Sequence, residues 1–123
     1  MTKTNELKKL IKSIISEVIN PCGFKKVPKD TMYPHATFSF SSVNLGDMNR
    51  NDYIIDVDLW DKGESTKRID EIADNLEEVF NNKNIPQDSI LPTFYLMDRR
   101  NVEDEDKDIQ HVLLRIEVQN YER

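Results

Sequence analysis

Two aspartates separated by one residue, Asp56 and Asp58, with Asp61 three residues further on, are the side chains of this sequence best placed to do chemistry. They lie in a stretch that alternates apolar and polar residues, and residues i and i+2 of a strand project from the same face of a sheet. Two neighbouring carboxylates can share a hard divalent cation such as Mg²⁺, and Glu117 of another expected strand would complete the ligand set. That arrangement would make the chain a small metal-dependent nuclease.

The same alternation has a simpler interpretation, because polar residues alternate with apolar ones on any half-exposed strand. No lysine-bearing nuclease motif accompanies the two aspartates. We therefore expect no metal site and no catalytic residue, and we keep a nuclease that uses Asp56 and Asp58 as the alternative.

The other reactive residue types are too few or too scattered for a catalytic or cofactor site. His35 and His111 are the only histidines, and neither has a cysteine or a second histidine at a metal-ligand spacing. The three glycines lie far apart, which excludes a phosphate-binding glycine-rich loop. Cys22 is the only cysteine, so no intramolecular disulfide can form, and its surroundings give no reason for an activated thiolate. We expect a protein without enzymatic activity and without a cofactor.

The charge balance argues against a free-standing nucleic-acid binder. The 123 residues fit a single domain, residues 1–123, and 17 Lys+Arg against 23 Asp+Glu give a net charge of −6. Phosphate neutralisation supplies most of the affinity of such binders, so an acidic chain is poorly suited to the task. The charge is also segregated, because residues 1–30 hold seven lysines and three acidic residues, whereas the remainder holds ten basic and twenty acidic residues. This segregation fits either an ordinary charged surface or electrostatic complementarity between copies of the chain.

Nothing in the sequence indicates export or a membrane. The first ten residues are polar and rich in lysine, without the apolar stretch of a secretory signal. No apolar run approaches the roughly 18–20 residues that a membrane-spanning helix needs. We expect an intracellular protein that does not contact a membrane.

Two helices and four strands must position the residues named above. Apolar residues recur at helical spacing from Leu7 to Ile19 and from Ile69 to Phe80, which predicts two amphipathic helices. Alternation with period two predicts strands at residues 36–41, 53–60, 92–97 and 111–121. The order α-β-β-α-β-β indicates an α+β fold of two layers, a four-stranded, mainly antiparallel sheet with both helices on one face. The polar face of the sheet would then carry Thr37, Ser39, Asp56, Asp58, Arg115 and Glu117.

Two features of the expected fold are suited to contacts with partners. Trp60 ends the second strand on the polar face, where it either covers a sheet edge or anchors an interface. Residues 98–108 show no apolar pattern, and five of their last six residues are acidic. We expect a long loop there, and long loops are functional or disordered.

The block Tyr53–Gly63, YIIDVDLWDKG, resembles one in the tail terminator proteins of long-tailed bacteriophages and prophages, also called tail completion or head–tail joining proteins. The Asp98-Arg99-Arg100 segment, the acidic loop and residues 114–123 are similar to the same family. The resemblance spans most of the chain, although residues 1–34 take no part in it. It implies a small α+β subunit of the virion that forms a hexameric ring, without enzymatic activity or cofactor.

The resemblance also implies partners and a location. The ring caps the tail tube at its head-proximal end, stops tube polymerisation and docks to the head connector or stopper, with DNA only as passing cargo. The subunit would be found in the host cytoplasm during assembly and at the head–tail interface of the virion afterwards. A ring needs head-to-tail contacts between different patches. We expect the assembly interface to include Trp60, Arg99, Arg100, Glu103, Asp104, Glu105, Asp106 and Asp108. A small phage-encoded regulatory binding module is the remaining alternative.

Overall fold

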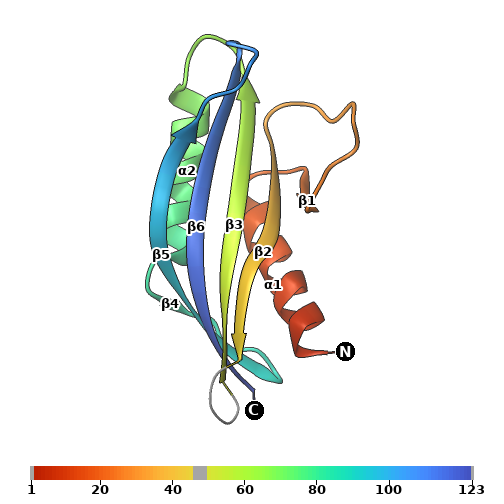
Figure 1. Ribbon diagram of the computed structural model, residues 1–123, viewed down its shortest axis with the longest axis vertical. Coiled ribbons are helices and arrows are strands. Elements are labelled where there is room, and N and C mark those ends of the chain that lie inside the picture. The colour runs from red at the N-terminus through yellow and green to blue at the C-terminus, as the bar shows by residue number, and fades with distance from the viewer. Residues whose placement is uncertain (1, 46–49, 123) are drawn as a thin grey trace.

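A twisted sheet with two helices against one of its faces makes up the protein (Figure 1). The computed structural model describes residues 2–45 and 50–122. The elements in chain order are α1 (Lys3–Val18), β1 (Cys22–Phe24), β2 (His35–Leu45), β3 (Arg50–Lys62), α2 (Lys67–Phe80), β4 (Lys83–Asn84), β5 (Ile90–Val102) and β6 (Ile109–Glu122).

The α+β class and the two helices on one face of the sheet are confirmed, but the prediction of four strands is wrong. Within the described residues the sheet has six strands in the order β1-β2-β3-β6-β5-β4. The four predicted strands are its long central members, and all pairs are antiparallel except β1 with β2, which is parallel. The two missed strands are the short edge strands β1 and β4, with three and two residues. Strands of that length are too short to show an alternating pattern.

The prediction of a loop over residues 98–108 is also wrong in its first half. Strand β5 continues to Val102, and only residues 103–108 connect it to β6. A β-bulge between Leu96 and Asp98 inserts one residue, so the alternation of faces shifts by one position beyond it. This shift breaks the period-two alternation along β5, because Asp98 and Arg100 then share the face that carried Tyr95.

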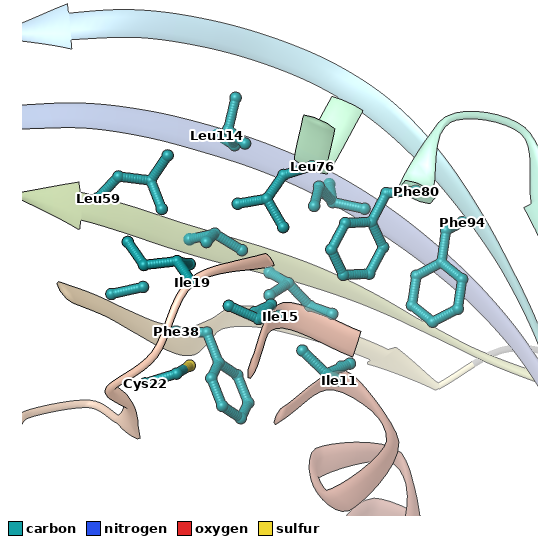
Figure 2. Close-up of a cluster of buried hydrophobic side chains, with 14 of the residues drawn as sticks. Ile11, Ile15, Ile19, Cys22, Phe38, Leu59, Leu76, Phe80, Phe94 and Leu114 are labelled. Atoms are coloured by element: carbon teal, nitrogen blue, oxygen red, sulfur yellow. The ribbon is translucent and has the colours of Figure 1, made fainter. Parts of the chain in front are cut away.

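The hydrophobic core lies between the sheet and the helices (Figure 2). It is built from the predicted apolar faces, so those faces are confirmed. Both helices and the central strands contribute Leu7, Ile11, Ile15, Ile69, Leu76, Phe80, Ile55, Val57, Leu114 and Ile116, all of them buried. Neither helix in the described ranges is long and apolar enough to cross a membrane.

Cys22 belongs to this core, where its side chain lies near Phe38 (Figure 2). Burial raises the pKa of the Cys22 thiol to about 11, and the nearby charge of Lys12 offsets only part of that effect. The group is therefore a neutral thiol at physiological pH, which is the state of a small core residue rather than of a nucleophile.

Candidate functional site

The face of the sheet opposite the helices is here called the open face (Figure 1). It carries the candidate metal ligands Asp56, Asp58 and Glu117. The strand register places Thr37 opposite Asp58, and Ser39 opposite Asp56. On the other side of β3, Asp56 lies opposite Arg115 and Ile54 lies opposite Glu117. The alternation of buried and half-buried residues along β3 matches this assignment. The predicted composition of the polar face is thus confirmed.

Asp56 and Asp58 share the open face, but each carboxylate has a different partner on β6. Arg115 Nε donates to Asp56 Oδ1 over 2.9 Å, and His111 Nε2 lies 2.7 Å from Asp58 Oδ1. Glu117 instead accepts a hydrogen bond from Gln119 Nε2. In the described ranges no group of three or more His, Cys, Asp or Glu side chains is arranged to hold a metal ion. The carboxylates therefore tie β3 to β6 by charge-assisted hydrogen bonds across the strand pair.

Trp60 lies in a row of four aromatic rings that crosses one end of the open face. The register places His35, Trp60 and His111 opposite one another on β2, β3 and β6. Trp60 stacks on His111 with ring centroids 4.5 Å apart, and its centroid lies 5.5 Å from that of His35. Tyr33 extends the row beyond His35 at 5.0 Å. Trp60 thus has a histidine ring on either side, and it is not an isolated side chain that projects from the sheet.

A hollow of about 540 Å³ adjoins this row of rings. His35 and Trp60 line it from the open face, and Lys25, Lys26, Asp104 and Asp106 are among the loop residues around it. His35 is buried, and its Nδ1 lies 3.1 Å from the carbonyl oxygen of Met32, so that nitrogen carries the proton. Oppositely charged loop residues therefore line the same hollow, together with rings of the aromatic row.

Arg99 and Arg100, both expected at an interface, have carboxylate partners in their own chain. Arg99 reaches over α2, with Nη1 at 2.7 Å from Asp74 Oδ1 and 3.4 Å from Glu77 Oε2. It thereby compensates the like charges of the helix surface, which repel one another at i, i+4 and neighbouring positions. Arg100 bonds to Asp98 with Nη2 at 2.5 Å from Oδ2, and this bond lowers the pKa of the Asp98 carboxyl. The assembly role of the two arginines stays a prediction.

Hydrogen bonds between its own backbone amides and aspartate side chains hold the acidic loop, residues 103–108. The amide of Asp106 donates to Asp104 Oδ1 over 3.0 Å, and the amide of Asp108 donates to Asp106 Oδ1 over 2.9 Å. The carbonyl oxygen of Asp108 also accepts from the amide of Gly63, which ties the loop to the turn after β3. Such aspartate turns fix a loop without a core residue beneath it.

Asp61, the third aspartate of the candidate metal motif, forms an ion pair with Arg68 that joins the end of β3 to the start of α2. Asp61 is only 2% exposed, and Arg68 donates to both of its oxygens, Nε at 2.8 Å and Nη2 at 2.5 Å. These hydrogen bonds, with a smaller contribution from the amide of Lys62, hold the pKa of Asp61 below its ordinary value. The signal was available, because Asp61 continues the buried alternation of Tyr53 through Leu59.

Replacing Asp61 with alanine is expected to lower the free energy of unfolding by about 1.5–3 kcal/mol at pH 7, since hydrogen bonds to a charged group are lost. The folded pKa lies below the unfolded one, so the contribution of Asp61 is complete above the ordinary pKa of about 3.9 and disappears as the pH falls through the folded value. Urea denaturation from neutral to acidic pH should therefore show the two proteins converging in acid. Glu71→Ala, on the exposed side of α2, is the matched control. Equal stabilities at pH 7 would contradict the assignment.

Comparison with known proteins shows a likeness of fold. No protein-family model matches the chain, and no curated protein matches it. Among solved structures, one chain of the virion of a native gene transfer agent particle is similar, with a TM-score of 0.65. The likeness covers 90% of this chain and 86% of that chain at 7% sequence identity.

Proposed function

We propose that this chain is a structural subunit of a phage-type virion, and more closely a tail terminator or head–tail joining protein. The observation that carries the proposal is the fold shared with a chain of a gene transfer agent virion over nearly the full length of both. The sequence block Tyr53–Gly63 supports the finer assignment, since it resembles the tail terminator family.

The geometry suits a subunit that works by contact rather than by chemistry. The open face and the outer sides of the sheet remain available to partners, because both helices lie against the other face (Figure 1). We propose that copies of the chain form a hexameric ring that caps the tail tube protein and docks to the head connector or stopper. Assembly takes place in the host cytoplasm, and the ring then remains at the head–tail interface, where an acidic lumen lets DNA pass without sticking.

Of the two alternatives, neither gains support from the structure. A metal-dependent nuclease would need Asp56 and Asp58 to converge on one ion, but each is bonded to a basic or imidazole side chain of β6. We propose accordingly that the chain is not an enzyme. The regulatory binding module has no structural observation in its favour.

The proposal is tested by the assembly of the purified chain, measured by native mass spectrometry and negative-stain electron microscopy. We expect monomers or weak oligomers in dilute solution, and rings in concentrated solution or on tubes of a phage tail tube protein. Raising the salt should shift the equilibrium towards monomers, because exposed charge pairs are screened beyond a Debye length of about 8–10 Å.

Bovine serum albumin, an acidic protein of unrelated fold, serves as the control for binding to the tubes. A chain that stays monomeric at every concentration and does not bind the tube ends would contradict the proposed function. Rings that strengthen with added salt would retain the function but point to an apolar contact around Trp60.

A further inference from the structure

We infer that neighbouring copies in the ring are joined by two oppositely charged segments at one end of the sheet. The first is the basic segment, residues 25–29, which carries Lys25, Lys26 and Lys29. The second is the acidic loop, residues 103–108, of the next copy. The inference rests on the ring proposed above and identifies which surfaces of neighbouring subunits meet in it.

The two segments lie at the same end of the sheet but belong to its opposite sides. One cross-strand row runs from His35, where β2 begins, through Trp60 and His111 to Val102, where β5 ends. The basic segment precedes β2 and the acidic loop follows β5, so both adjoin this row (Figure 1). In the strand order β1-β2-β3-β6-β5-β4, the long strands β2 and β5 are the outermost.

This placement fits the requirement of a ring built from one kind of subunit. A head-to-tail contact joins two different patches on opposite sides of each copy, and it closes when the rotation between copies closes. If the rotation axis runs along the strands, the β2 side of one copy meets the β5 side of the next with their ends level. The basic segment of one copy then meets the acidic loop of its neighbour.

The charges of both segments are free to act between copies. Lys25, Lys26 and Lys29 are exposed, and no carboxylate of the described part of the chain lies within 4.0 Å of their amines. Within the described residues, no basic group lies within 4.0 Å of the five carboxylates of the acidic loop, which are Glu103, Asp104, Glu105, Asp106 and Asp108. Within one copy both segments line the hollow, but no ion pair within 4.0 Å joins them among the described residues.

The acidic loop is also prepared for binding, because its aspartate turns already hold its backbone. A preorganised loop loses less conformational entropy when it binds than a flexible one. The acidic loop therefore does not have to become ordered before the electrostatic attraction can hold it against the neighbouring copy.

The sides that would approach each other are largely uncovered. Strand β1 pairs only with residues 36–38 of β2, and β4 pairs only with residues 93 and 94 of β5. Beyond these residues, Val43 of β2 is 49% exposed and Met97 of β5 is 52% exposed. Val43 lies on the β2 side and Met97 on the β5 side, so the contact between copies would also bury apolar surface.

Reversing the charge of either segment tests the inference. The basic-reversed variant carries Lys26→Glu and Lys29→Glu, and the acid-reversed variant carries Glu103→Lys, Glu105→Lys and Asp108→Lys. All five side chains are exposed, and none of them makes a side-chain hydrogen bond within the described residues, so the fold should persist. At low salt we expect each variant alone to lose ring formation, with an association constant at least about tenfold lower than that of the unchanged chain.

An equimolar mixture of the two variants should regain rings. In an alternating ring every contact joins unlike charges, because the reversed basic segment meets the reversed acidic loop and the two unchanged segments meet each other. A ring of six accommodates this alternation. Native mass spectrometry distinguishes the mixed ring by its mass.

Two matched controls carry the same change of net charge on the helices. Lys9→Glu with Lys12→Glu on α1 takes the net charge from −6 to −10, as the basic-reversed variant does. Glu71→Lys and Glu78→Lys on α2 with Glu17→Lys on α1 take it to 0, as the acid-reversed variant does. Both controls should assemble like the unchanged chain.

The outcomes separate this inference from the proposed function. Suppose that the unchanged chain forms rings. The inference alone is then overturned if the reversed variants assemble as well as the unchanged chain, if the controls are impaired as much as the reversed variants, or if the mixture does not regain rings. An unchanged chain that never forms rings would overturn both.

A cross-linking experiment provides a second readout that does not depend on ring stability. Lys26→Cys and Glu103→Cys are prepared as separate variants, mixed, and treated with a short thiol-reactive cross-linker. The buried Cys22 thiol does not compete, because its pKa is raised to about 11. The mixture should give a dimer of the two variants, and neither variant alone should, since a head-to-tail contact never brings two identical patches together. Dimers from one variant alone would overturn the inference.

Discussion

Replacing Ile55 with aspartate is expected to abolish the folded state. Ile55 is fully buried at the middle of β3, opposite Phe40 on β2 and Ile116 on β6. An unpaired carboxylate in such a place costs several kcal/mol in addition to the lost apolar burial. The total stability of a domain is only about 5–15 kcal/mol, so the variant should be unfolded at room temperature. Far-UV circular dichroism and the loss of a cooperative thermal transition would show this.

The neighbouring residue provides the control. Asp56→Asn lies on the open face, where the side chain can still accept a hydrogen bond from Arg115. Its cost should remain below about 1 kcal/mol, which is the range of partly exposed ion pairs. A cooperative transition of Ile55→Asp at the temperature of the unchanged chain would contradict the position of the core.

Truncating Phe80 to alanine is expected to cost about 3–5 kcal/mol, because a buried phenylalanine leaves a cavity. The ring closes the end of α2 against β5, with its centroid 5.2 Å from that of Phe94 in an edge-on arrangement (Figure 2). Both side chains are at most 1% exposed. Chemical denaturation of the single and double alanine variants would measure the loss and the coupling between the rings, which should be about 0.5–1.5 kcal/mol.

Phe24→Ala is the matched control for Phe80→Ala. Phe24 also contacts other aromatic rings, but it is only partly buried on the short edge strand β1. Its truncation should therefore cost clearly less than that of Phe80. A loss below about 1 kcal/mol for Phe80→Ala would show that the site collapses around the smaller side chain.

Long periodic segments made most of the fold predictable. Both helices and the four long strands show their apolar faces over several turns or alternations, as in the series from Tyr53 to Leu59. The failures have local causes. Strands β1 and β4, with three and two residues, are too short to show a repeated alternation, and the bulge after Leu96 reverses the faces of β5. The sequence therefore predicts a loop at Arg99, whereas the strand directs this side chain onto α2.

The open face could be predicted, but the contacts on it could not. Alternation alone places Asp56 and Asp58 side by side. Their partners Arg115 and His111 are more than fifty residues away, and only the register of β3 with β6 brings them opposite. The same register creates the row of rings around Trp60. Pairing across strands is a property of the assembled sheet, and no spacing within one strand encodes it.

The row of rings gives the protein a built-in optical probe. Trp60 is the only indole in the chain, so intrinsic emission excited near its absorption edge comes from a single known position. That position is beside the hollow, between two imidazole rings, and not in the core between the sheet and the helices. Fluorescence thus reports the local environment of one end of the sheet, whereas circular dichroism averages over the whole backbone. Recorded together during denaturation, the two signals distinguish fraying of that end from cooperative loss of the entire fold.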